Sequence, residues 1–178
     1  MTKIGRCAFY GCTSLESIII PDSVTKIGNT AFMNCRSLIG VSVPLSVTVI
    51  ESCTFLGCSS LVGIDLPSSV KAIEYYAFFG CKSMMDITIP SSVTKIGEMA
   101  FARCKNLEHI DIPPLVTKIE SCTFYGCENL TSFIVPDSVT KIGLDAFSDC
   151  KNMKEIVVND ASLLENAGVP KGVKIVKS

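Results

Sequence analysis

Residues 4–26 read IGRCAFYGCTSLESIIIPDSVTK, and versions of this stretch follow one another along the chain. An isoleucine, a phenylalanine and a cysteine each return every 23 residues, without insertion or deletion. The isoleucines are Ile4, Ile27, Ile50, Ile73, Ile96, Ile119 and Ile142; the phenylalanines are Phe9, Phe32, Phe55, Phe78, Phe101, Phe124 and Phe147; the cysteines are Cys12, Cys35, Cys58, Cys81, Cys104, Cys127 and Cys150. Seven copies therefore occupy residues 4–164. A fixed period of about 20–50 residues is typical of a solenoid or array.

Each copy contains two extended segments. In copy 1, Leu15–Ile20 is rich in β-branched residues with alternating inward positions, which predicts a strand. Pro21 follows and ends the strand, because proline has no N–H to donate. Val24–Gly28 is expected to form a second, shorter extended piece.

The segment between these extended pieces is a tight turn. Ala8–Gly11 is too short for a stable helix, so we expect a 3₁₀ or single helical turn. The Gly11 position is filled down the copies by Gly11, Asn34, Gly57, Gly80, Arg103, Gly126 and Asp149. Glycine, asparagine and aspartate favour a positive φ at this position, and Arg103 is the exception to the pattern.

The apolar positions of one copy cannot be buried within that copy. They are Ile4, Phe9, Leu15, Ile18, Ile20 and Val24 in copy 1. Copies stacked at roughly 4.8 Å, the spacing of strands, bury them against one another. This stacking explains why the 178-residue chain is 48% hydrophobic although its apolar runs are far shorter than the roughly 20 residues of a membrane span. A net charge of −1 excludes a general nucleic-acid-binding protein.

The two ends of the array differ. Residues 1–164 hold the seven-copy solenoid, and residues 165–178 are predicted to be a capping segment in which Val173–Val176 forms a final strand. The first copy begins just before Ile4, without a preceding Leu-x-x-Ile-x-Ile strand. We therefore expect either a fragment of a longer repeat protein or a partner that covers this end.

The pattern Leu-x-x-Ile-x-Ile-Pro-x-x-Val-Thr-x-Ile-Gly-x-x-Ala-Phe-x-x-Cys resembles the BspA-like class of leucine-rich repeats over residues 3–158, most clearly in residues 136–143 and 146–150. The resemblance implies a right-handed leucine-rich repeat β-solenoid, with one parallel sheet, short second strands and 3₁₀ or helical turns. It also implies a cell-surface or secreted protein of bacteria or some protists, with a role in adhesion and protein binding and no enzymatic activity.

The ten cysteines occupy two positions of the repeat. The seven at the Cys12 position are predicted to form a buried ladder of thiols, because cysteine packs as a small hydrophobic residue. Parallel side chains disfavour disulfides between neighbouring copies, and a linear file of thiols is a poor zinc site. Cys7, Cys53 and Cys122 share a second position of the repeat. The other copies place both polar and apolar residues at this position, which indicates partial exposure. We predict ten free thiols, of which these three react first.

A candidate partner-binding face lies on the outward side of the Leu15–Ile20 strands. Its polar residues are Asp65, Asp86, Thr88, His109 and Asp111. A solvated strand face is the alternative interpretation. A divalent cation site among the aspartates is another, although no loop motif supplies the six or more oxygens that calcium requires.

Two other files of side chains are candidates for surface roles. One follows each phenylalanine: Tyr10, Met33, Leu56, Phe79, Ala102, Tyr125 and Ser148. It is either partly packed in the core or an exposed interface. The other contains Lys26, Lys95, Lys118 and Lys141. Because glutamates lie nearby, we interpret the lysine file as a solvated charged face.

The sequence predicts an interaction module that binds a protein or glycan ligand of a host or cell surface. A structural spacer within a larger repeat protein is the alternative. No catalytic residue, metal or cofactor is expected, because His109 is predicted to point outward and Cys104 inward, and no phosphate-binding loop or hydrolase motif occurs. No nucleic acid and no membrane insertion are expected, and the oligomeric state is left open.

Overall fold

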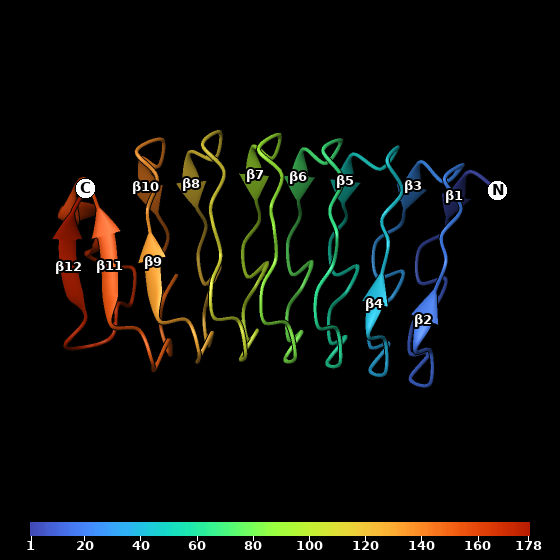
Figure 1. The fold of residues 1–178 in the computed structure, drawn as a ribbon, viewed down its shortest axis with the longest axis horizontal. Coiled ribbons are helices and arrows are strands. Elements are labelled where there is room, and N and C mark those ends of the chain that lie inside the picture. The colour runs from blue at the N-terminus through green and yellow to red at the C-terminus, as the bar shows by residue number, and fades with distance from the viewer.

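The computed structural model describes residues 1–178 as a row of stacked rungs, with the two termini at opposite ends (Figure 1). Each copy makes one circuit and then pairs in parallel with the next copy, as Lys3 does with Lys26 and Ile4 with Ile27. The register between paired strands equals the 23-residue repeat. The predicted parallel β-solenoid is confirmed.

The strands form two files along the row (Figure 1). The file around the repeated Lys-Ile pair contains β1 (Lys3–Ile4), β3 (Lys26–Ile27), β5 (Val49–Ile50), β6 (Ala72–Ile73), β7 (Lys95–Ile96), β8 (Lys118–Ile119) and β10 (Lys141–Ile142). The other file, which we call the strand side, contains β2 (Ser17–Ile18), β4 (Gly40–Val41), β9 (Ser132–Ile134), β11 (Glu155–Val158) and β12 (Lys174–Lys177). A 3₁₀ helix, η1 (Ala161–Leu164), is the only helix.

The strand side is less regular than the sequence predicts. Copy 3 contributes only a single bridge, between Ser42 and Asp65, and copies 4 and 5 contribute no strand. The inward residues Ile64, Ile87 and Ile110 of these copies are nevertheless buried. Apolar burial rather than a continuous hydrogen-bond ladder thus holds this segment.

The segment equivalent to residues 5–12 of copy 1, which we call the corner, is the most regular part of the rung. Its backbone N–H groups alternate: that of Ala8 donates to Gly5 within the rung, while that of Phe9 donates to Ala31 of the next rung at 2.8 Å. The turns within the rung are of the expected 3₁₀ type, since each bond joins residues three apart, and they do not extend into a helix because every second N–H is used between rungs. The positive φ predicted at the Gly11 position is confirmed in all copies, and it extends to Arg103 (60°).

A second left-handed position in each corner was not predicted. The residues at the Cys7 position all have φ between 54° and 58° although none is glycine: Cys7, Thr30, Cys53, Tyr76, Met99, Cys122 and Asp145. Left-handed φ is unfavourable for such residues and above all for β-branched Thr30. The backbone N–H of each residue donates to the next rung, as that of Cys7 does to Asn29, and these bonds offset the strain.

The repeated phenylalanines and cysteines form two ladders inside the corner. Successive rings stack almost parallel, from Phe9–Phe32 at 5.0 Å to Phe101–Phe124 at 6.0 Å. Six of the ladder thiols donate to the phenylalanine carbonyl of the preceding rung, as Cys104 Sγ does to Phe78 O at 3.2 Å. The expectation that all seven ladder cysteines are buried is wrong for Cys12, which is exposed because no earlier rung covers it.

The last rung is completed by residues beyond the seventh copy. β12 pairs in parallel with β11, so that Ile156 lies opposite Ile175. The η1 helix is capped by the Asp160 carboxylate, which accepts from the Ser162 N–H at 2.9 Å. A strand was expected at Val173–Val176, and it occurs one residue later.

Candidate functional site

The five polar residues predicted for the partner-binding face are all exposed on the outward side of the strand side: Asp65, Asp86, Thr88, His109 and Asp111. His109 Nε2 lies 3.1 Å from Asp111 Oδ1, and both side chains are largely exposed. Asp65 and Asp86 form no ion pair with any residue of the chain. The face therefore presents two free carboxylates beside a histidine–aspartate pair.

An apolar strip next to these residues was missed in the sequence. Ile39, Val62 and Met85 are 54%, 43% and 52% exposed on three consecutive rungs. Their backbones are joined directly, because the Val62 N–H donates to Ile39 O and the Met85 N–H to Val62 O. A comparison of the copies at this position of the repeat could have revealed the strip. The position holds Glu16 in copy 1 and Glu108 in copy 5, but an apolar residue in each of the three copies between them.

The strip stays uncovered because the neighbouring outward residues are small. Gly40 and Gly63 follow Ile39 and Val62 in the sequence and carry no side chain. A Cβ placed on Gly63 would have only Asp86 within 4 Å. Three apolar side chains and the carboxylates of Asp65 and Asp86 thus share one continuous face.

The chemistry of a metal centre or a nucleophile is not assembled on this face. No group of three or more His, Cys, Asp or Glu side chains is placed to hold a metal ion. His109 is exposed whereas Cys104 is buried, as predicted, so the two do not form a pair. Burial raises the pKa of the Cys104 thiol to about 12, which keeps it protonated.

The three cysteines of the second position are more accessible than the ladder. Cys7 is exposed, and Cys53 and Cys122 are half-buried. Burial raises the pKa of Cys53, and burial together with the Asp145 and Glu98 carboxylates raises that of Cys122. A raised pKa lowers the thiolate fraction, so exposure alone does not make these two thiols reactive.

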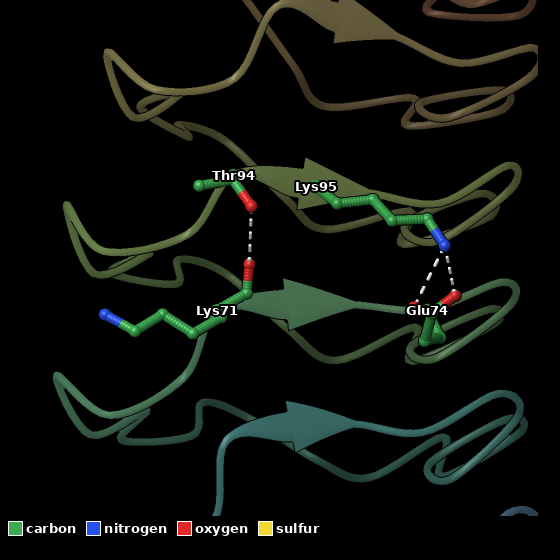
Figure 2. A network of polar contacts seen from close by, with 4 residues as sticks. All are labelled: Lys71, Glu74, Thr94 and Lys95. Atoms are coloured by element: carbon green, nitrogen blue, oxygen red, sulfur yellow. Dashed lines mark hydrogen bonds and ion pairs between the residues drawn. The ribbon is translucent and has the colours of Figure 1, made fainter.

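Two of the four cations of the lysine file, Lys26 and Lys95, are paired with glutamates of adjacent rungs. Figure 2 shows Lys95 Nζ donating to both carboxylate oxygens of Glu74, at 2.9 and 2.7 Å. Thr94 Oγ1 beside it donates to the Lys71 carbonyl at 3.3 Å, while the Lys71 side chain points away from Glu74. Lys26 pairs with Glu51 at 2.8 Å. This part of the file is neutralised within the chain.

A parallel β-solenoid with this period, a phenylalanine–cysteine corner and shallow outward faces defines a leucine-rich repeat protein. The family model described as the BspA type leucine-rich repeat region matches residues 1–82 and 54–166, with six copies. The chain belongs to this family.

Solved structures of repeat proteins resemble the chain along most of its length. A leucine-rich repeat protein of T. pallidum is 33% identical, with a TM-score of 0.80, over 86% of this chain and 72% of that one. One from Bacteroides ovatus is 30% identical, with a TM-score of 0.67, over 100% of this chain and 55% of that one. The pneumococcal vaccine antigen PcpA is 24% identical, with a TM-score of 0.66, over 92% of this chain and 45% of that one, and it shows the fold alone.

The chain spans about half the length of the second and third of these proteins. No curated protein sequence matches it. The structure contains no helix with the length and apolar character needed to cross a lipid bilayer.

Proposed function

We propose that the chain is a protein-interaction module whose strand side binds a protein partner, within a surface or secreted protein that mediates adhesion. The observation that carries this proposal is the exposure of Ile39, Val62 and Met85 on three consecutive rungs beside the free carboxylates of Asp65 and Asp86. Families of leucine-rich repeats commonly mediate protein interaction and are generally non-enzymatic, which supports the same interpretation.

The arrangement of this face matches the anatomy of protein interfaces. An apolar centre surrounded by a polar rim is typical of specific contacts, and its energy is concentrated in a few central residues. Val62 and Met85 would form the centre, while Asp65 and Asp86 would accept hydrogen bonds from lysine or arginine of the partner. A partner with an apolar patch and a basic rim fits this face.

The experiment measures binding of the purified chain to a panel of purified extracellular proteins by surface plasmon resonance. Saturable binding of at least one panel member is expected, and Val62→Glu combined with Met85→Glu should abolish it. Asp65→Ala with Asp86→Ala should weaken it by about tenfold, the effect of losing two exposed charged contacts of about 0.7 kcal/mol each. Leu144→Glu is the matched control, because Leu144 is an exposed apolar residue (60%) of the corner.

A structural spacer is the competing proposal, supported by the elongated row of rungs (Figure 1). A spacer acts through its length, so removing two copies from the full-length parent would abolish adhesion while the strand-side variants leave it unchanged. An interaction module shows the opposite pattern. Unchanged panel binding in the Val62→Glu and Met85→Glu double variant would overturn the strand-side site.

A further inference from the structure

The corner carries a hollow that the function proposed above does not use. The hollow has a volume of about 420 Å³ and extends over copies 2 to 5. Arg36, Ser59, Lys82 and Phe79 are among the residues that line it. Asn34, Gly57, Gly80 and Arg103, which occupy the same position of the repeat on four consecutive rungs, also line it.

Two glycines on consecutive rungs line this hollow. Gly57 and Gly80 have φ of 74° and 72°, so the turn itself favours glycine at both rungs. Asn34 and Arg103 occupy the same position in the flanking rungs and keep their side chains. The Asn34 side chain reaches over Gly57, where a Cβ would meet it, whereas a Cβ on Gly80 would have only the Gly57 Cα atom within 4 Å. The file of side chains is therefore open above Gly80.

The charges around this hollow have no partner in the chain. Six ion pairs form elsewhere in the structure, but none includes Arg36, Lys82 or Arg103. The Arg103 guanidinium lies 5.7 Å from the centre of the Phe79 ring, so a cation–π contact holds it at the rim. Three positive charges and a half-buried aromatic ring thus face one space that contains no acidic residue.

A neighbouring hollow shows that this charge is not a general property of the repeat. The next interruption of the file, at Gly126, is lined by Lys105, Lys151 and Glu128. Glu128 accepts from both lysines, at 2.7 and 3.1 Å, and these contacts hold the pKa of its carboxyl below the usual value. Asp149 adds a second acid there. Arg103 also lines this second hollow, so three cations there face two acids, whereas the first hollow has three cations and no acid.

We propose that the hollow of Arg36, Lys82 and Arg103 binds an anionic saccharide, independently of the strand side. Guanidinium and ammonium groups match the oxygens of sulfate or carboxylate groups, and the guanidinium does so with two parallel hydrogen bonds. The Asn34 amide and the Ser59 hydroxyl supply donors and acceptors for sugar hydroxyls. Phe79 supplies an apolar surface for the C–H face of a sugar ring.

The backbone around the hollow favours a saccharide over an acidic peptide. A bound peptide strand gains affinity by pairing its main chain with free N–H and C=O groups. Here the Gly57 N–H donates to Phe79 O and the Gly80 N–H to Ala102 O, both at 2.8 Å, and the Ser83 N–H donates to Ser59 O. These groups are already used between rungs, so recognition falls to side chains that suit anionic oxygens and hydroxyls.

The test is calorimetric titration of the purified chain with a heparin-derived tetrasaccharide, which carries both sulfate and carboxylate groups. Binding is expected in 50 mM salt and should weaken strongly in 300 mM salt, because screening acts on exposed charges. Arg36→Glu with Lys82→Glu should lower the affinity by more than about tenfold, since two charged contacts are lost. Lys71→Glu is the matched control, because Lys71 is exposed and does not line the hollow.

A second variant tests whether binding depends on the shape of the hollow and not only on the net charge of the chain. Gly80→Asn fills the hollow without changing the net charge, and Asn34 shows that asparagine adopts the same turn with φ of 61°. This variant should fold and lose about tenfold in affinity. Equal losses in Lys71→Glu and in the double variant would overturn the site, as would full affinity in Gly80→Asn. Equal binding of a glutamate octapeptide would overturn the saccharide assignment, and no binding in 50 mM salt would overturn the whole proposal.

Discussion

The corner and the strand side of each rung are built from the same repeat but are held in different ways. In the corner, every junction between copies 1 and 7 has three backbone hydrogen bonds, as from Cys53, Phe55 and Gly57 to the next rung. On the strand side, copies 3 and 4 are joined by a single backbone hydrogen bond, which the Met85 N–H donates to Val62 O. No backbone hydrogen bond joins copies 5 and 6 on this side. The corner therefore holds the stack together, and the strand side is free to vary in its outward residues.

This division separates stability from recognition within one small rung. The phenylalanine and cysteine ladders and the most regular set of cross-rung bonds lie in the corner, so substitutions there should affect folding. The exposed residues of the strand side make few internal contacts, so substitutions there should affect binding alone. Repeat proteins allow this separation because each rung needs only its neighbours for stability.

The largest expected effect concerns thiol labelling. Six of the seven ladder thiols are buried, and burial raises the pKa of Cys58, Cys104 and Cys150 to about 12. They should react only when the corner opens, which slows labelling by more than about a thousandfold for an opening free energy near 4 kcal/mol. Mass spectrometry after timed alkylation of the native chain should find exposed Cys7 and Cys12 labelled first.

Labelling in denaturant is the control, because all ten thiols should then react at similar rates. A native intrachain disulfide, or early labelling of Cys104, would contradict the buried ladder. Early labelling of Cys12 differs from the sequence-based prediction, which placed only the three cysteines of the second position first.

The second prediction concerns the phenylalanine stack. Phe78 is fully buried and stacks on Phe55 at 5.5 Å and on Phe101 at 5.4 Å. Phe78→Ala should lower the free energy of unfolding by about 3–5 kcal/mol, the usual range for a large core truncation. Phe9→Ala should cost less, because Phe9 is half-buried and stacks only on Phe32. Urea unfolding of the two variants measures the difference, and equal losses would argue against nearest-neighbour stacking.

The sequence predicted the corner better than the strand side. The period fixed which residues form the ladders, and glycine, asparagine and aspartate at the Gly11 position revealed the left-handed turn. The second left-handed position carries Thr30 and Tyr76, residues that give no such signal. The thiol-to-carbonyl bonds also needed the three-dimensional structure, because they join residues 26 apart in neighbouring rungs.

The candidate site was predictable only in part. Alternation along the strand placed Asp65, Asp86 and His109 outward, and the structure has all three exposed. The Ile39–Val62–Met85 strip was detectable by comparing copies but lies one residue outside the alternating positions. The hollow at Gly57 and Gly80 lies between the side chains of Asn34 and Arg103. The sequence shows two glycines at this position of the repeat, but it does not show that the flanking side chains leave a space.

The third prediction concerns the thiol-to-carbonyl bonds. Cys81 Sγ donates to Phe55 O at 3.3 Å and is fully buried, whereas Cys12 is exposed and makes no such bond. Cys81→Ala should lower the free energy of unfolding by about 1–2 kcal/mol, through a lost hydrogen bond and a small cavity. Cys12→Ala is the matched control and should have almost no effect. A measurable loss in Cys12→Ala equal to that in Cys81→Ala would show that burial in the ladder is not the cause.

The smallest effect compares one glycine of each region. Gly80 of the corner has φ of 72°, and a Cβ there would have only the Gly57 Cα atom within 4 Å, at 4.0 Å. Gly80→Ala should therefore cost about 1 kcal/mol through left-handed strain alone, without a steric clash. A Cβ on Gly63 of the strand side would lie 3.9 Å from Asp86 Oδ1, an ordinary contact, and this residue does not have a positive φ.

Gly63→Ala should leave stability unchanged or raise it by about 0.5 kcal/mol, because alanine lowers the entropy of the unfolded chain. The same unfolded-state gain applies to Gly80→Ala, so the difference between the two variants isolates the strain at the corner. Thermal and urea unfolding of both variants measure this difference. If the two substitutions are equal in effect, the corner turn has relaxed its φ, and the contrast between a rigid corner and a tolerant strand side fails at this position.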